Sequence, residues 1–283
     1  MRKQQEKQKS NEKSILTIYG VPLSQPFRAV VWPCLIHSIP FRIEFAVPFS
    51  KSQTNGTKSD SYMLKFPLGT IPSIEFTDDN CKEIALSQSS LRLSESPAIL
   101  SFLAAKYGVE ELYPTVLKAR VDEYCHWHHS NLRYLTVAFF RPAMIISHSN
   151  DSLSQKKYDA RRAEKALKVI EESYLRASFE NGGIFLLGTI TPSAADFLAY
   201  SEIAQVGPYF GNLVTVSANV LTWIESMKKL PYHDEVHVAL KYIVGDLNRA
   251  NDVGISKKRL TEANMIWLKA IQNIVSEKQK SKL

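Results

Sequence analysis

The sequence has little of what most metal-binding and nucleotide-binding proteins need. Its three cysteines, Cys34, Cys81 and Cys125, form no C-x-x-C pair and are too few for a disulfide scaffold or a zinc ribbon, which favours a reducing compartment. Neither G-x-G-x-x-G nor G-x-x-x-x-G-K-[ST] occurs, so no glycine-rich phosphate loop is indicated. No hydrophobic run approaches the ~18 residues of a membrane-spanning helix. Residues 1–14 lack the apolar core of a cleaved signal peptide, so we expect no secretion by that route.

Basic charge is concentrated at the two ends of the chain. Of the net charge of +7, residues 1–14 carry +3 and residues 256–283 carry +5, which leaves −1 for residues 15–255. A nucleic-acid-binding protein usually concentrates basic side chains on its folded domain. The distribution therefore favours solubilising tails. Binding of nucleic acid through the tails remains a third hypothesis, and it predicts steep salt dependence.

Hydrophobic periodicity divides the chain into an α/β part and a helical part. Residues 15–108 show the order strand, helix, strand, loop, strand, strand, helix. Residues 114–249 show only helical spacing, and residues 250–283 add another amphipathic helix. Residues 1–14 have no apolar periodicity and are predicted to form a disordered basic arm. The expected fold class is α/β plus all-α.

Individual elements are also predicted. Strands are expected at residues 14–20, 41–47, 71–76 and 91–93, with a loop at 48–61. In the second part, helices are expected at residues 117–139, 154–180, 216–229 and 232–244. Ser24 and Ser193 stand at predicted helix starts, and Pro33 is expected to kink the first helix.

Three short segments place polar groups where a ligand could bind. Ser24 precedes the first helix, so its hydroxyl could donate to a ligand sulfur at the positive end of the helix, or simply cap the helix. A cis bond before Pro72 would leave the backbone of Ile71 free to pair with an extended peptide. Glu95 and Ser96 suit an ammonium and a carboxylate, or serve as ordinary capping residues. Glutathione carries a thiol, an extended backbone and adjacent amino and carboxylate groups, and it matches all three places.

The histidines do not indicate a metal site. His233 and His237 are one helical turn apart, but no third ligand is evident, so an exposed polar helix face is favoured. His126, His128 and His129 spread over different helix faces and are expected to be surface or core histidines. We therefore predict no metal.

Five motifs together resemble the theta-like cytosolic glutathione S-transferases. They are LSQPFRAV at residues 23–30, PLGTIP at 67–72, LSESPAIL at 93–100, RVDEYCHW at 120–127 and SAAD at 193–196. Each motif alone is weak, but all five occur in the family's order at about its spacing. The resemblance covers roughly residues 15–245.

The resemblance implies a thioredoxin-like domain at 15–108, an all-helical domain at 114–249, and usually a homodimer. It implies that Ser24 is the catalytic residue, donating a hydrogen bond to the sulfur of glutathione, which is the co-substrate. Ile71 would pair with the cysteinyl backbone beside cis Pro72. Together, Glu95 and Ser96 would hold the γ-glutamyl end.

The chain also departs from the family pattern. Theta-like enzymes bring basic or imidazole groups toward the glycine carboxylate, whereas Thr57, Gly69 and Thr70 take the approximate places here and leave Lys58 as the nearest cation. Arg133 falls where such enzymes carry an arginine near the active site, and it is assigned to the electrophile pocket. Residues 77–90 are longer than the usual hairpin, and the helix after 255 would either cover the electrophile pocket or decorate the surface.

The implied activity is conjugation of the glutathione thiolate to small electrophiles, with glutathione peroxidase activity on organic hydroperoxides as an addition. The alternative is a non-catalytic glutathione-transferase-like binding or assembly module, because the basic set is weakened and the chain carries extra terminal segments.

The chain ends in Ser281, Lys282 and Leu283, which together form the peroxisomal import tripeptide. We expect import into the peroxisome, or a related organelle, through the import receptor. The alternative is a cytoplasmic protein whose polar tail ends this way by chance.

Overall fold

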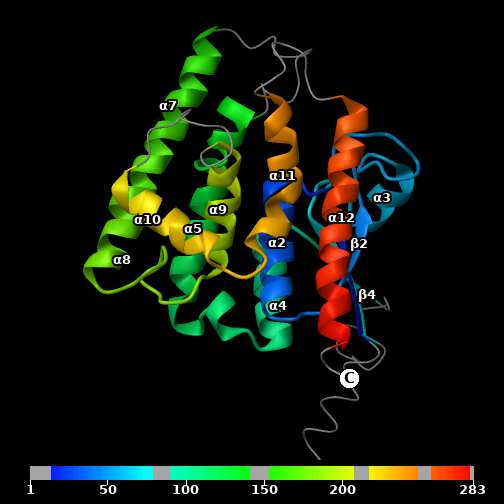
Figure 1. The fold of residues 1–283 in the computed structure, drawn as a ribbon, viewed down its shortest axis with the longest axis horizontal. Coiled ribbons are helices and arrows are strands. Elements are labelled where there is room, and N and C mark those ends of the chain that lie inside the picture. Colours follow the sequence, from blue (N-terminus) through cyan, green and yellow to red (C-terminus); the bar gives the residue numbers. More distant parts are fainter. Residues whose placement is uncertain (1–13, 79–89, 141–152, 207–216, 248–255, 281–283) are drawn as a thin grey trace, which may run out of the picture.

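The computed structural model describes residues 14–78, 90–140, 153–206, 217–247 and 256–280. Within these residues a small mixed sheet lies beside a set of helices that makes up most of the molecule (Figure 1). This order confirms the expected α/β plus all-α class.

A four-stranded sheet forms the first half of the fold. Its strands are β1 (Ser14–Gly20), β2 (Arg42–Phe45), β3 (Ser73–Asp78) and β4 (Ser90–Ser94), in the spatial order β2-β1-β3-β4. β2 is parallel to β1, whereas β3 is antiparallel to both β1 and β4. The parallel pair requires a crossover, which helix α2 (Gln25–Ile36) supplies.

Helices cover both faces of this sheet. On one face, α2 and α4 (Ser96–Tyr107) pack on Leu16 and Ile18, and Pro33 lies inside α2. On the other, the short helix α3 (Asp60–Lys65) contributes Tyr62 to a separate apolar cluster. The sequence pattern did not predict α3, which depends on packing against the sheet.

The second half is helical. It contains α5 (Lys118–Ser130), a π-helical turn (Thr136–Phe140), α7 (Leu153–Val169), a π-helical segment (Ile170–Leu175), α8 (Arg176–Glu180), α9 (Ala194–Val206), α10 (Ala218–Lys228) and α11 (His233–Leu247). The predicted single helix over 117–139 is wrong, because α5 ends at Ser130. The Asn131 side chain donates to the Trp127 carbonyl at 2.8 Å and so competes with continuation of the helix.

The S-x-x-D start signal is confirmed at α9. The Asp196 carboxylate accepts from the Ser193 N–H and hydroxyl, each at 2.9 Å. It also accepts from the Leu186 N–H at 2.9 Å and the Trp223 indole at 3.0 Å. One buried carboxylate thus ties the start of α9 to the preceding loop and to α10.

Helix α12 (Lys257–Lys280) is part of the core and does more than decorate the surface. It lies beside α11 and to the right of α2 in the view of Figure 1. Trp267 is fully buried, its ring lies 5.5 Å from that of Phe27 in α2, and its indole N–H donates to Val236 at 3.0 Å. At the other end of α2, Lys278 donates to the Ser38 hydroxyl at 3.1 Å. The helix therefore contacts α2 near its start, at Phe27, and just beyond its end, at Ser38.

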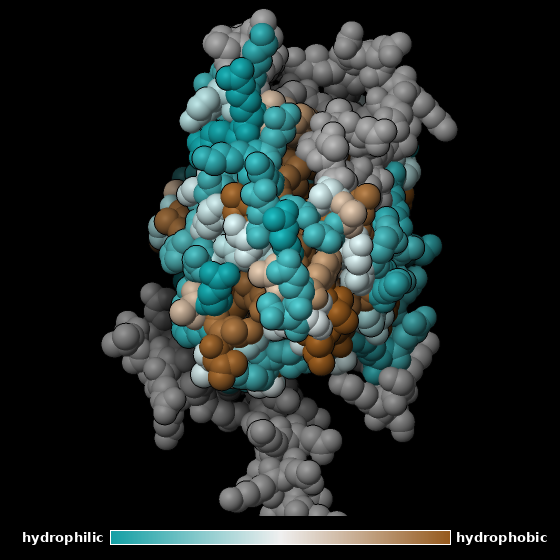
Figure 2. All heavy atoms as spheres, turned by 90° about the vertical axis from the view of Figure 1, so that its left-hand side faces the viewer, coloured by the Kyte–Doolittle hydropathy of each residue, from teal (hydrophilic) through white to brown (hydrophobic). Residues whose placement is uncertain are grey.

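The surface on the side of α7 and α10 is mostly hydrophilic, and its hydrophobic atoms form small separate groups (Figure 2). Exposed apolar side chains near the ends of α8 and α10 are Ile184, Ile190 and Leu221. None of the helices in the described ranges combines the length and apolar character needed to cross a membrane.

Candidate functional site

Ser24 immediately precedes α2 and keeps its hydroxyl unused. Its backbone is extended, its N–H donates to the Val21 carbonyl at 3.0 Å, and its carbonyl accepts from Arg28 at 3.1 Å. The half-buried side chain makes no capping hydrogen bond. The alternative in which the Ser24 side chain caps the helix is therefore wrong. A free hydroxyl remains at the positive end of the helix dipole.

The Ile71–Pro72 peptide bond is cis, which confirms that part of the prediction. On the preceding residue, the Thr70 carbonyl accepts from the Tyr62 hydroxyl at 2.7 Å and from the Ser73 hydroxyl at 3.1 Å. The backbone N–H and C=O of Ile71 have no hydrogen-bond partner within the described ranges. They are free to pair with an extended ligand.

Glu95 and Ser96 stand at the start of α4. Glu95 is exposed and has φ of 71°, in the left-handed region that non-glycine residues seldom adopt. Its side chain makes no capping hydrogen bond, which argues against an ordinary cap. Ser96 is the first residue of the helix and is 7% exposed.

The strand register brings these three segments to one end of the sheet. Ser73, at the start of β3, pairs with Tyr19 near the end of β1 and with Ser94 at the end of β4. The chain leaves this end toward Ser24 after β1 and toward Glu95 after β4. It arrives there through Ile71. The predicted site residues, which come from distant parts of the first half, therefore lie at one end of the sheet.

Lys58 lies against the turn that leads to Ile71. Its side chain is exposed, and a Cβ added at Gly69 would stand 2.5 Å from the Lys58 Nζ. Gly69 has φ of 60°, a conformation that suits glycine. The ammonium group thus sits over the turn at residues 67–72.

Arg133 reaches the same region from the helical half. Its guanidinium donates to Glu202 Oε1 at 2.8 Å, and Glu202 in α9 is only 1% exposed. Glu202 Oε2 accepts from the Gln25 amide at 3.2 Å and from the Thr136 hydroxyl. Because Gln25 follows Ser24 directly, Arg133 is connected to the Ser24 segment through this buried carboxylate. None of the sequence motifs points to Glu202, and its signal is an acid in the otherwise mostly apolar stretch of α9.

A groove of about 490 Å³ runs between α4 and α5 and begins at Glu95. Asp122, His126 and His129 line it, together with Cys125. Burial raises the pKa of the Cys125 thiol to about 12, so this cysteine is protonated at neutral pH and does not act as a nucleophile.

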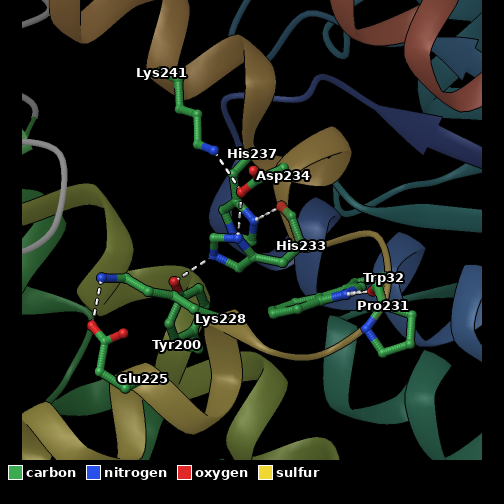
Figure 3. Close-up of polar contacts among 9 residues, drawn as sticks. All are labelled: Trp32, Tyr200, Glu225, Lys228, Pro231, His233, Asp234, His237 and Lys241. Atoms are coloured by element: carbon green, nitrogen blue, oxygen red, sulfur yellow. Dashed lines mark hydrogen bonds and ion pairs between the residues drawn. The ribbon is translucent and has the colours of Figure 1, made fainter.

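His233 and His237 are buried side by side in α11, so the expected exposed face is wrong (Figure 3). His233 engages both ring nitrogens, with Asp234 at 2.8 Å and the Tyr200 hydroxyl at 2.6 Å, and His237 Nδ1 contacts the His233 carbonyl at 2.7 Å. The indole of Trp32 packs on both rings and covers this face of α11. Burial lowers the pKa of both imidazoles. No cluster of three or more metal-ligating side chains occurs in the part of the chain that the structure describes.

The other histidines behave as predicted. His128 is buried, with Nδ1 3.2 Å from the Tyr124 hydroxyl, while His126 and His129 are exposed. Several sequence predictions fall outside the described residues. These are the arm at 1–13, most of the insertion at 77–90, Cys81, and the tripeptide at 281–283.

Comparison with known proteins gives relatives of one kind. No protein-family model matches the chain. It is 32% identical to glutathione S-transferase theta-1 of Homo sapiens over 194 residues, which cover 66% of this chain and 72% of that protein. It is 27% identical to glutathione S-transferase T1 of Arabidopsis thaliana over 258 residues, 86% of this chain and 96% of that protein. It is 29% identical to glutathione S-transferase T3 of the same plant over 80% of this chain, but that match spans only 37% of T3.

Solved structures share the fold. Human glutathione transferase theta-2, in complex with glutathione and an unknown ligand, matches with a TM-score of 0.66 at 21% identity, covering 90% of this chain and 99% of that one. Human glutathione S-transferase T1-1 in its apo form matches with a TM-score of 0.62 at 24% identity, covering 90% of this chain and 98% of that one. These neighbours confirm the expected thioredoxin-like domain followed by a helical domain.

Proposed function

The chain belongs to the theta-like glutathione S-transferases, and from this premise we propose that it joins glutathione to small electrophiles, with Ser24 holding the reacting sulfur as a thiolate. The observation that carries the proposal is the Ser24 hydroxyl. It has no partner among the described residues and stands at the N-terminus of α2, at the same sheet end as Ile71 and Glu95.

The chemistry requires a modest change in the acidity of the thiol. A free thiol has a pKa of ~8.5, so only a few per cent is ionised at neutral pH. Lowering that value by ~2 units makes the thiolate dominant and corresponds to ~2.7 kcal/mol. A hydrogen bond to a charged group contributes ~1.5–3 kcal/mol and a helix dipole ~0.3–1 kcal/mol. The Ser24 hydroxyl and the end of α2 are therefore sufficient without a general base.

The remaining residues hold the tripeptide. The free backbone groups of Ile71, beside cis Pro72, pair with the cysteinyl unit in the manner of an added strand. Glu95 binds the γ-glutamyl ammonium, and the Ser96 hydroxyl with the first N–H groups of α4 binds its carboxylate. Lys58 attracts the glycine carboxylate from beside the turn at Gly69.

In the reaction, the thiolate attacks an electrophilic atom and forms a new bond to sulfur, while the leaving group departs with the bonding electron pair. The thiol proton passes to solvent. We assign Arg133 to the electrophile side, since its guanidinium is one-third exposed beside the Ser24 segment. A peroxidase reaction uses the same thiolate: it attacks a hydroperoxide oxygen, releases the alcohol, and a second glutathione completes the disulfide with loss of water.

We further propose a homodimer and peroxisomal import. The homodimer is supported by the family membership, and sedimentation of the purified chain tests it. Import is supported by the terminal Ser281, Lys282 and Leu283. Deleting these three residues should redirect a fluorescent fusion to the cytoplasm, whereas retained peroxisomal signal would refute the role of the tripeptide.

The Ser24→Ala variant tests the catalytic proposal. We expect the acid limb of kcat/KM for several electrophiles to move up by ~2 pH units, because the thiol loses its hydrogen-bond donor. The Ser226→Ala variant removes a hydroxyl from α10 and is the matched control. Equal rates for wild type and Ser24→Ala would remove Ser24 from the mechanism. Absence of heat on titration with millimolar glutathione would favour the non-catalytic module.

A further inference from the structure

A buried acid underlies the Ser24 segment. Glu202 lies in α9, in the helical half, and its side chain is 1% exposed. An isolated buried carboxylate is costly, so its partners matter. It receives an ion pair from Arg133 at 2.8 Å, a hydrogen bond from the Thr136 hydroxyl and one from the Gln25 amide at 3.2 Å.

Neighbouring residues of α9 hold the chain on both sides of Ser24. The Gln205 amide donates to the Leu23 carbonyl at 3.3 Å. The Pro22 carbonyl, two residues before Ser24, accepts from the Arg28 guanidinium at 2.8 Å, and Arg28 also donates to the Ser201 carbonyl at 2.9 Å. Residues before and after Ser24 are therefore fixed to one helix of the other half.

We propose that Glu202 is a positioning residue for the reaction: through Gln25 and Thr136 it fixes the first turn of α2, and so directs the Ser24 hydroxyl toward the sulfur of bound glutathione. This inference rests on the function proposed above for Ser24. Gln25 is the first residue of α2 and is 4% exposed, so a change in its side-chain position is transmitted to the backbone beside Ser24.

The composition of this contact favours positioning over simple stabilisation. A buried ion pair often contributes little net stability compared with apolar packing. The same helix also buries the Gln205 Oε1 and the Ser201 hydroxyl without a partner among the described residues. A polar contact between α9 and α2 with unpaired buried groups beside it adds little to stability. Its effect on the geometry of the first turn of α2 explains the contact better.

Two variants of one residue separate position from charge. Glu202→Gln and Glu202→Leu both remove the negative charge, and with it the ion pair to Arg133. Only the glutamine keeps an oxygen that accepts from the Thr136 hydroxyl and the Gln25 amide. The measurement is the pH dependence of kcat/KM, with glutathione binding followed by calorimetry and stability by urea unfolding.

We expect the acid limb of Glu202→Leu to lie about one pH unit above that of Glu202→Gln. Glutathione affinity should differ by less than about threefold, because Ile71, Glu95 and Ser96 are unchanged. Should Glu202→Leu fail to fold, Thr136→Val is compared with Thr136→Ser, which keeps the hydroxyl. Coincident acid limbs in the pair that folds, with only the stability altered, would overturn the proposal.

The Ser24→Ala variant, measured in the same assay, distinguishes the two proposals. If Ser24→Ala moves the acid limb while the acid limbs of the two Glu202 variants coincide, only the positioning role of Glu202 is refuted. If Ser24→Ala leaves the acid limb unchanged, the proposed role of Ser24 is refuted and the role of Glu202 with it.

Discussion

Acidification should destabilise the protein through His128, and one substitution isolates the effect. The imidazole is 8% exposed in α5. Burial, together with the positive charges of Arg133 and His129, lowers the pKa of His128 to about 3. The native imidazole therefore stays neutral while that of the unfolded chain takes up a proton below about pH 6.5. Because only the unfolded chain takes up this proton, the free energy of unfolding falls as the pH falls.

The size of the loss follows from the two pKa values. Between pH 7.5 and pH 5, a group that titrates near 6.5 when unfolded and near 3 when folded costs about 2 kcal/mol of unfolding free energy. Urea unfolding at several pH values measures it. The His128→Gln variant keeps a side chain able to hydrogen-bond the Tyr124 hydroxyl but cannot titrate, so it should lose about 2 kcal/mol less than wild type over this range.

Other buried histidines do not confuse the comparison. His233 and His237 contribute to the acid sensitivity of wild type and variant alike, so their effect cancels in the difference. His126→Gln is the matched control, since an exposed imidazole on the same helix loses little hydration on folding. Equal acid losses in wild type and His128→Gln would refute the reasoning.

Two further predictions concern helix α12 and the turn at residues 67–72. Trp267→Ala should lower the unfolding free energy by about 3–5 kcal/mol in urea titrations, because it removes the contact with Phe27. The neighbouring Ile266 is 36% exposed, so Ile266→Ala should cost far less, and equal losses would contradict a core role for α12. Gly69→Ala and Gly182→Ala both place alanine at positive φ. Gly182→Ala, whose added Cβ meets nothing within 4 Å, should cost about 1 kcal/mol, and Gly69→Ala should cost more, because its Cβ would also stand 2.8 Å from the Met63 Sδ. Only Gly69→Ala displaces the Lys58 ammonium, so only it should weaken glutathione binding in calorimetry; unchanged affinity would separate Lys58 from the site.

Much of the first half could be predicted because its signals are local. The strands at Ser14–Gly20 and Arg42–Phe45 follow from alternation and β-branched residues, and the start of α2 follows from a serine and a proline. The cis bond before Pro72 was also predicted from the sequence. Each of these features depends on a few consecutive residues.

Features that depend on packing could not be predicted. In helix α3, which the Ser59 hydroxyl caps, Tyr62 packs on Tyr19 of β1, a contact that no periodicity reveals. Without a third metal ligand, His233 and His237 were predicted to lie on an exposed helix face, but the indole of Trp32 covers both imidazoles. Whether the Ser24 hydroxyl caps α2 was likewise undecided until the backbone was known.

The same distinction applies within the candidate site. The motif at residues 23–30 identifies Ser24 but not what holds it in place. Gln25 meets Glu202, which lies 177 positions further along the chain, and Leu23 meets Gln205, 182 positions further along. A first half folded without α9 would keep the serine and the helix end, but it would lose the contacts that fix their direction. In the proposed site the first half therefore supplies the hydroxyl, and α9 of the second half holds the residues on either side of it.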